Sequence, residues 1–178
     1  MIEPLFLDTD CLSTFLVVRK ENLMLQLYNG RIGIPKQVYK ELEKVSFLKS
    51  RVDSLINSKR VLVYHLDINT ESGALYLKMT KNPDVGFKLI GSGEAAAIVL
   101  TKQYNGILGS NNMRDIIPYI QLFGLKHRTS ADIMVEAFEQ NLIGEGQGNT
   151  IWREMLDRNR KLPTNTFTEF LNKYKHDK

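Results

Sequence analysis

The segment LFLDTDCLSTFL, residues 5–16, decides the fold class of this chain. It starts with Leu5 to Leu7, a short apolar run that has no helical period and is followed directly by Asp8. From Cys11 to Val18 the apolar residues then recur at helical spacing. The pattern predicts a buried strand that ends at Asp8, then a turn, then a helix.

The same alternation of short strands and helices continues along the chain. Further strands are predicted at 31–34, 61–66, 107–109 and near Leu125, and helices at 21–28, 35–45, 47–57, 72–80, 94–104, after Ser110, and from Thr129 or Ser130 to Gly144. Residues 81–93, rich in Gly and containing a Pro, are predicted to form a surface loop. We therefore expect an α/β fold of three layers, α/β/α, with a central parallel sheet of four to five strands.

Length and composition limit the domain organisation and the compartment. The 178 residues, 43% of them hydrophobic, suit one core, and we assign residues 1–145 to the domain and 146–178 to a helical C-terminal extension packed on it. A single Cys excludes an intramolecular disulfide, and three scattered His give no zinc spacing. With no signal peptide and no run of about 18 apolar residues, we expect a soluble, cytoplasmic protein with no membrane partner.

Acidic residues follow several of the predicted strands. Asp8 ends the first strand, Glu41 lies in the helix after the second, Glu94 starts an Ala-rich helix, and Asp115 follows the fourth strand. In parallel sheets the functional crevice lies at the carboxyl ends of the strands, so these side chains can share one crevice. Carboxylates are the ligands that Mg²⁺ and Mn²⁺ prefer, and such ions activate water for phosphoryl displacement.

Four segments resemble the PIN-domain family, which includes ribonucleases and the toxins of toxin–antitoxin pairs. They are LFLDTDCLSTFL (5–16), IPKQVYKELEKV (34–45), GSGEAAAIVL (91–100) and GILGSNNMRDI (106–116). The resemblance implies a metal-dependent endoribonuclease that uses Mg²⁺ or Mn²⁺, cleaves RNA, most naturally single-stranded, and leaves a 5′-phosphate and a 3′-hydroxyl. It also implies a small antitoxin protein as a partner, and a homodimer.

The resemblance also assigns roles to residues. The catalytic set is Asp8, Glu41, Glu94, Asn111 and Asp115, of which Asp8, Glu41, Glu94 and Asp115 are the expected metal ligands; Asp10, Ser13, Ser110 and Asn112 are supporting residues. Where the family usually has Asp after the fourth strand, this chain has Ser110, Asn111 and Asn112. An amide oxygen can ligate a metal but brings no charge, and Asp115, one turn after Asn111, can compensate.

Each acid also has a structural interpretation that the sequence leaves open. Asp8 can cap a helix, Glu41 can belong to a solvated charged face, and Glu94 and Asp115 can favour the positive end of a helix dipole. The net charge of +4 suits a polyanionic partner. Basic residues that can line a phosphate-binding surface are at 19, 20, 36, 40, 44, 49, 51, 153, 158, 160 and 161.

Two other functions compete with the nuclease. A degenerate PIN domain that has lost its catalytic acid would bind RNA or a protein partner without cleavage, and the Asn111–Asn112 pair favours this alternative. An unrelated doubly wound protein such as a phospho-receiver also gathers acids at strand ends. It ranks last, because no suitably placed Lys follows a later strand.

Overall fold

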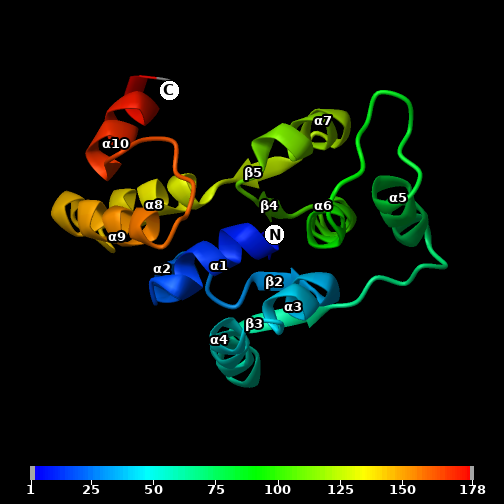
Figure 1. Ribbon diagram of the computed structural model, residues 1–178, viewed down its shortest axis with the longest axis horizontal. Helices are drawn as coiled ribbons and strands as arrows, with labels where there is room; N and C mark the ends of the chain where they lie inside the picture. Colours follow the sequence, from blue (N-terminus) through cyan, green and yellow to red (C-terminus); the bar gives the residue numbers. More distant parts are fainter. Residues whose placement is uncertain (1–2, 177–178) are drawn as a thin grey trace.

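The computed structural model describes residues 3–176, and a five-stranded sheet forms its centre (Figure 1). The strands are β1 (Leu5–Leu7), β2 (Ile32–Pro35), β3 (Val61–Tyr64), β4 (Ile107–Gly109) and β5 (Lys126–Arg128), in the order β3-β2-β1-β4-β5 with every neighbouring pair parallel. The predicted α/β fold with a parallel sheet of four to five strands is confirmed. The predicted domain (1–145) starts at residue 1 and the predicted extension (146–178) ends at residue 178, and both of these residues lie outside the described part of the chain.

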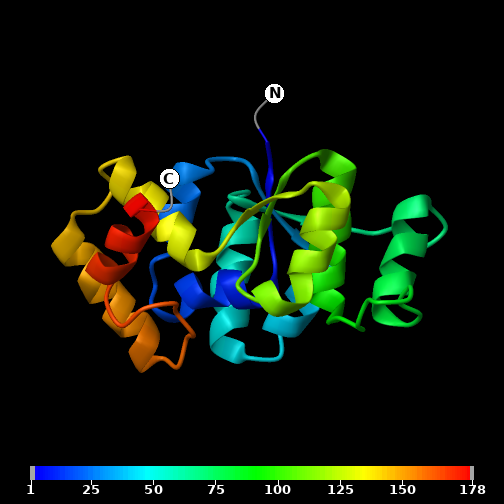
Figure 2. The same ribbon diagram turned by 90° about the horizontal axis from the view of Figure 1, so that it is seen from above.

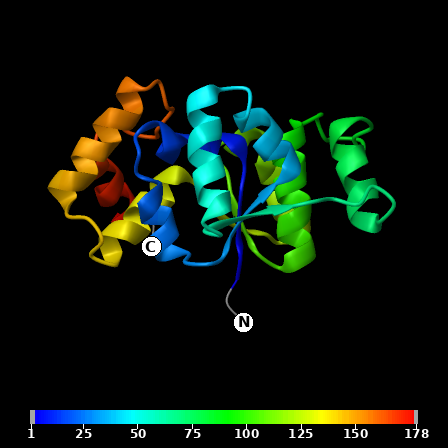
Figure 3. The ribbon, with the colours of Figure 1, turned by 90° about the horizontal axis from the view of Figure 1, so that it is seen from below.

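Helices connect the strands and cover both faces of the sheet. They are α1 (Thr9–Val17), α2 (Glu21–Leu27), α3 (Lys36–Leu42), α4 (Ser46–Asn57), α5 (Glu71–Thr80), α6 (Ser92–Tyr104), α7 (Met113–Phe123), α8 (Ser130–Glu139), α9 (Glu145–Asp157) and α10 (Phe167–His176). Figures 1 and 3 show α5 at one end of the molecule and α8, α9 and α10 grouped at the other. No helix in this described part is long and apolar enough to cross a membrane.

Alternation along β1 separates the core into two parts, because successive side chains of a strand point to opposite faces. Leu5 and Leu7 belong to a cluster that includes side chains of α1, α2, α4 and α8. On the other side, Leu108 of β4 packs with the alanines of α6 and with α5 and α7. Phe6 of β1 contacts the ring of Tyr64, with the ring centroids 5.0 Å apart. Figure 2 shows the strands running between these layers.

Several helix boundaries differ from the sequence prediction by a few residues, and in two of them the predicted capping residue is wrong. The helix after β5 ends at Glu139, not at Gly144, and Gly144 is the N-cap of α9. Asn141 ends α8 because it adopts a left-handed conformation (φ 58°), and the Leu142 amide then donates to the carbonyl of Ala137. Ser110 is not the cap of α7, whose N-cap is Asn112. Asn and Gly both suit helix ends, so the pattern alone did not separate them.

The C-terminal helices share the core of the sheet. Trp152 of α9 and Phe167 of α10 are fully buried in the same cluster as Leu5, and their ring centroids are 5.6 Å apart. The Trp152 indole nitrogen donates to the carbonyl of Thr164, 3.0 Å away, which holds the connection between α9 and α10 against α9. The domain limit at residue 145 stays a prediction, although the segments on its two sides pack together.

Candidate functional site

The carboxyl ends of β1 and β4 lie side by side at the centre of the sheet. Leu7 pairs with Gly109, and the Asp8 amide donates to the Gly109 carbonyl at 2.9 Å. Two adjoining hollows open at this edge, and Asp10 and Glu94 line both. The smaller, of about 170 Å³, is lined by Asp8, Thr9, Asp10, Glu41, Gly91, Gly93 and Glu94. The larger, of about 400 Å³, is lined by Asp10, Glu94, Asn111, Asn112, Arg114, Asn159 and Lys161.

Asp8 caps a helix with one carboxylate oxygen and leaves the other oxygen available for a ligand. It is the N-cap of α1, and its Oδ1 accepts a hydrogen bond of 2.7 Å from the Cys11 amide. Its Oδ2 is buried and has no hydrogen bond of normal geometry within residues 3–176, although the Ser110 hydroxyl lies near the carboxylate. Burial raises the pKa of Asp8 to about 7; the nearby Ser110 hydroxyl and the Cys11 amide oppose this rise, and Asp10 and Glu94 add to it. A buried carboxylate with one idle oxygen is costly unless a cation or a proton compensates it.

Glu41 does not lie on a solvated face. Its carboxylate accepts hydrogen bonds from the Thr9 hydroxyl, from the Ser92 hydroxyl at 3.0 Å and from the Gly93 amide at 3.1 Å. The approach of α3 to the first turn of α6 favours glycine at position 93, because a Cβ there would stand 2.9 Å from Glu41 Oε2 and would displace this carboxylate. Glu41 is therefore fixed at the N-terminus of α6, beside Asp8 in the smaller hollow.

Glu94 and Asp115 are linked by one amide group. Asn112 Nδ2 donates to Glu94 Oε1 at 2.7 Å and to Asp115 Oδ2 at 2.8 Å. Burial raises the pKa of Glu94, although the bonds from Asn112 and from the Gly91 amide act against this. The hydrogen bond from the Asn112 amide is the main cause that lowers the pKa of Asp115, and the hydrogen bond from Arg114 lowers it further. Asn112 thus lies between two carboxylates and donates a hydrogen bond to each.

Asn111 joins β4 to α8. Its Oδ1 accepts from the Ser130 amide at 2.7 Å, and its Nδ2 donates to the Ser130 hydroxyl at 2.9 Å and to Asp10 Oδ2 at 3.1 Å. Every polar atom of the side chain is used in these contacts. In this arrangement the amide oxygen of Asn111 faces the backbone N–H of Ser130, whereas the sequence analysis placed Asn111 in the catalytic set as a residue that assists the metal ligands.

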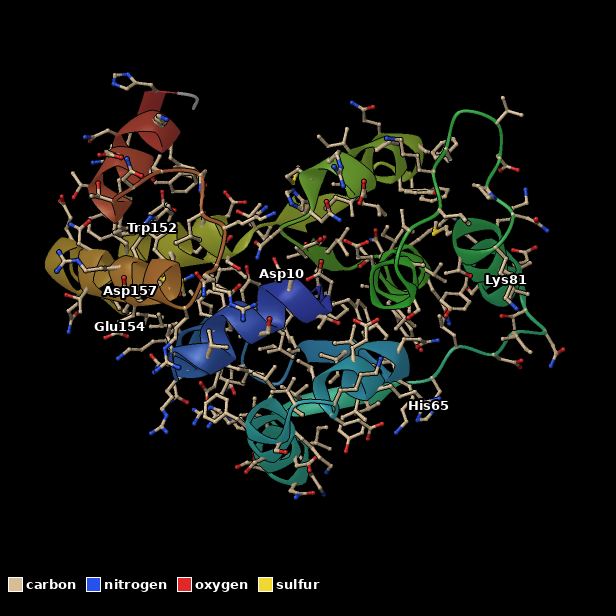
Figure 4. The ribbon with its side chains drawn as sticks, in the orientation of Figure 1. Asp10, His65, Lys81, Trp152, Glu154 and Asp157 are labelled. Atoms are coloured by element: carbon tan, nitrogen blue, oxygen red, sulfur yellow. The ribbon has the colours of Figure 1, made fainter. Side chains whose placement is uncertain are left out.

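The remaining supporting residues connect the site to the C-terminal segment. Asp10, at the start of α1 (Figure 4), lies 3.7 Å from the guanidinium of Arg160. The hydroxyl of Ser13 donates to the Asp10 carbonyl at 3.2 Å and accepts from Arg160 at 3.3 Å. Ser110 is buried beside Asp8, and its hydroxyl accepts from the Asn112 amide at 3.4 Å. The structure thus brings all nine predicted residues to one edge of the sheet.

Four residues of this edge were not predicted. Thr9 and Ser92 hold the carboxylate of Glu41, and Arg114 and Asn159 line the larger hollow. The position of Thr9 and Ser92 next to predicted acids or glycines was a weak signal that they line the site. Nothing in the local pattern distinguishes Asn159, because its role depends on how α9 packs.

The donor set suits a hard cation in its chemistry. Four carboxylates (Asp8, Asp10, Glu41 and Glu94) line one small hollow, and one buried Asp8 oxygen has no other partner. Among residues 3–176, however, no three His, Cys, Asp or Glu side chains converge closely enough to hold one ion as they stand. Glu41 and Glu94 are turned toward their hydrogen-bond donors instead. The residues fit a metal whose binding competes with those donors.

Comparison with known proteins agrees with this architecture. No curated protein matches the sequence significantly. The family described as PIN domain matches residues 5–176, which include β1 to β5, all nine predicted site residues and the two C-terminal helices. PIN domains are a family of nucleases. On this match over nearly the whole chain, the protein belongs to the PIN-domain family.

Proposed function

We propose that this protein is a metal-dependent endoribonuclease that hydrolyses single-stranded RNA at the edge where Asp8, Glu41 and Glu94 meet. The observation that carries the proposal is Asp8 itself. Its carboxylate is 1% exposed, has one oxygen without a hydrogen-bond partner among the described residues, and lines a hollow with three other carboxylates. Such an arrangement costs stability in the absence of a ligand, which favours a role in binding one.

The side chains would divide the work as follows. Asp8, Glu94 and Glu41 would hold Mg²⁺ or Mn²⁺, and Asp115 would support them through Asn112. A bound divalent ion supplies an activated water and neutralises charge on the phosphoryl oxygens. Burial raises the pKa of Asp8 to about 7, so Asp8 would release a proton when it becomes a ligand. Thr9 and the Gly93 amide position Glu41.

An activity assay tests this proposal. Purified protein is incubated with a labelled single-stranded RNA and Mn²⁺, beside an Asp8→Asn variant, because Asn keeps the helix cap but cannot become anionic. The variant should lose more activity than the about 10- to 100-fold that loss of an outer-shell partner costs. An Asp84→Asn variant, which changes an exposed acid in the loop before α6, should cleave like wild type. Absence of cleavage, or equal cleavage by Asp8→Asn, would contradict the proposal.

A second function has specific support. Both polar atoms of the Asn111 amide and the Nδ2 of Asn112 have protein hydrogen-bond partners, and Asn112 bridges Glu94 and Asp115 without a cation. This favours a PIN domain that binds RNA and does not cleave it. A titration of the protein with Mn²⁺ distinguishes the two functions. Millimolar Mn²⁺ should raise the melting temperature if the site binds metal, and should leave it unchanged if the site is degenerate.

Two partners belong to the same proposal through the family resemblance. A small antitoxin would cover the acidic edge, and two copies of the chain would form a homodimer. Co-purification with the product of the adjacent reading frame tests the first. Sedimentation of the isolated protein tests the second.

A further inference from the structure

The larger hollow has a wall that the acidic site does not explain. Residues of the acidic site (Asp10, Glu94, Asn111 and Asn112) line part of it, and three further residues with donor groups, Arg114, Asn159 and Lys161, complete the lining. Asn159 and Lys161 come from the connection between α9 and α10, far from the acids in the sequence. At about 400 Å³ the hollow lies within the 300–1,000 Å³ range, roughly, of small-molecule sites.

The backbone fixes where this connection points. Asn159 follows the C-terminus of α9 in a left-handed conformation (φ 59°), and the Arg160 amide donates to the Met155 carbonyl at 3.0 Å. This is the hydrogen bond that closes a helix and reverses the chain. The reversal directs residues 160 and 161 back toward α1. Farther along, the Trp152 indole holds the Thr164 carbonyl, so the segment is fixed at both ends.

Arg160 anchors the segment to the acidic site. Its guanidinium contacts Ser13 and lies 3.7 Å from Asp10, and its Nε is buried with no hydrogen-bond partner among residues 3–176. Lys161, the next residue, is exposed and makes no ion pair or side-chain hydrogen bond within the same residues. By contrast, Arg51 and Lys49 of the basic N-terminal half are paired with Glu21 and Asp53. Lys161 is therefore a basic group of the larger hollow that is free to take a phosphate.

We propose that the segment Asn159 to Lys161 is part of the RNA groove, and that Lys161 binds a backbone phosphate of the nucleotide that occupies the larger hollow. This inference rests on the proposed function, because it takes RNA as the ligand. Asn159 and Arg114 supply further donors on the same wall. Since the segment is already ordered, little conformational entropy is lost when RNA binds. The C-terminal extension is then a working part of the site and not only a support for the core.

A binding assay without metal tests this inference separately from cleavage. The binding of a fluorescent single-stranded 12-nucleotide RNA is followed by anisotropy in EDTA over a range of salt. Lys161→Ala should bind about two- to fivefold more weakly at moderate salt, as expected for one exposed charge pair. The slope of log affinity against log salt should fall by about 0.7, the value for one phosphate contact on a single strand. Lys161→Arg should restore both values, and Lys175→Ala, which removes an exposed charge on α10, should match wild type.

The outcomes separate the two proposals. Equal affinity and equal slope for wild type and Lys161→Ala overturn the present inference, while the cleavage assay with Asp8→Asn still decides the nuclease. Failure of the wild type to bind the RNA also overturns it. A lower affinity with an unchanged salt slope contradicts it too, because that pattern indicates a structural effect and not a lost phosphate contact.

Discussion

The two sides of the acidic crevice differ in how their polar atoms are satisfied. On the side of β1, Asp8 keeps a buried oxygen without a partner, and burial raises its pKa to about 7. On the side of β4, both polar atoms of the Asn111 amide and the Nδ2 of Asn112 have hydrogen-bond partners. The first side is costly unless a ligand arrives, and the second is stable without one. If the proposed function holds, ligand binding should therefore be concentrated at Asp8, while the Asn112 amide holds Glu94 and Asp115 together.

The largest effect is expected at Asp8. An acid whose pKa is raised from 3.8 to about 7 on folding destabilises the protein once it ionises, so the contribution of Asp8 to stability is most favourable below about pH 4 and falls as the pH rises to 7. Asp8→Asn should remove this cost and raise the free energy of unfolding at pH 8 by on the order of 4 kcal/mol. The gain should shrink toward pH 5. Urea denaturation in EDTA at both pH values measures it.

The control is a surface acid with the opposite shift. Lys49 and Tyr39 lower the pKa of Asp53, so Asp53→Asn should cost stability at pH 8 and less near pH 4. If Asp8→Asn is no more stable than wild type at pH 8, the buried carboxylate of Asp8 has no energetic cost. The two sides of the crevice would then not differ as argued above.

Asn112 offers the test of the other side. Asn112→Asp replaces a donor that bridges Glu94 and Asp115 with a third carboxylate, so it should lower stability in EDTA by roughly 3 kcal/mol, the loss of two hydrogen bonds to charged groups. Millimolar Mn²⁺ should recover most of this loss and raise the melting temperature more than in wild type. Asn172→Asp, an exposed change on α10, should show no metal effect. A variant that Mn²⁺ does not rescue would show that the amide does not occupy a cation position.

Gly93 connects the two sides through Glu41. In Gly93→Ala the new Cβ would stand 2.9 and 3.0 Å from the two carboxylate oxygens of Glu41 and 3.1 Å from the Thr9 hydroxyl. Overpacking of this kind costs about 1–3 kcal/mol, and displacement of Glu41 should also weaken Mn²⁺-dependent stabilisation. Gly146→Ala is the matched control, because no atom lies within 4 Å of the new Cβ and Ala favours the helix by about 1 kcal/mol. Thermal melts with and without Mn²⁺ distinguish these effects, and equal behaviour of the two variants would contradict the close packing around Glu41.

The sequence predicted the parts of this site that depend on local pattern. The strand before Asp8 and the helix around Glu41 follow from periodicity, and the sheet order then places them together. The partners of the two amides are not predictable in this way, because Asn111 and Ser130 are 19 residues apart and meet only through β4 and α8. Arg160 and Ser13, 147 residues apart, meet only because α9 joins the core. The helix end predicted at Gly144 was wrong because Asn141, which also suits the left-handed conformation, ends α8 before Gly144 is reached.

The smallest effect is expected at Arg114, which tests whether amide or charge holds Asp115. The Arg114 side chain is 82% exposed and lies 3.2 Å from Asp115, which Asn112 also binds. Exposed ion pairs contribute about 0–1 kcal/mol and are screened by salt, so Arg114→Ala should lower the free energy of unfolding by about 0.5 kcal/mol or less. Thermal melts at low and high salt check this, with Lys78→Ala, which removes a similarly exposed partner of Asp84, as the control. A decrease in the free energy of unfolding above about 1 kcal/mol would contradict this and would show that Arg114 holds Asp115 in place. The expected small loss leaves its guanidinium available to a ligand in the larger hollow, beside Lys161.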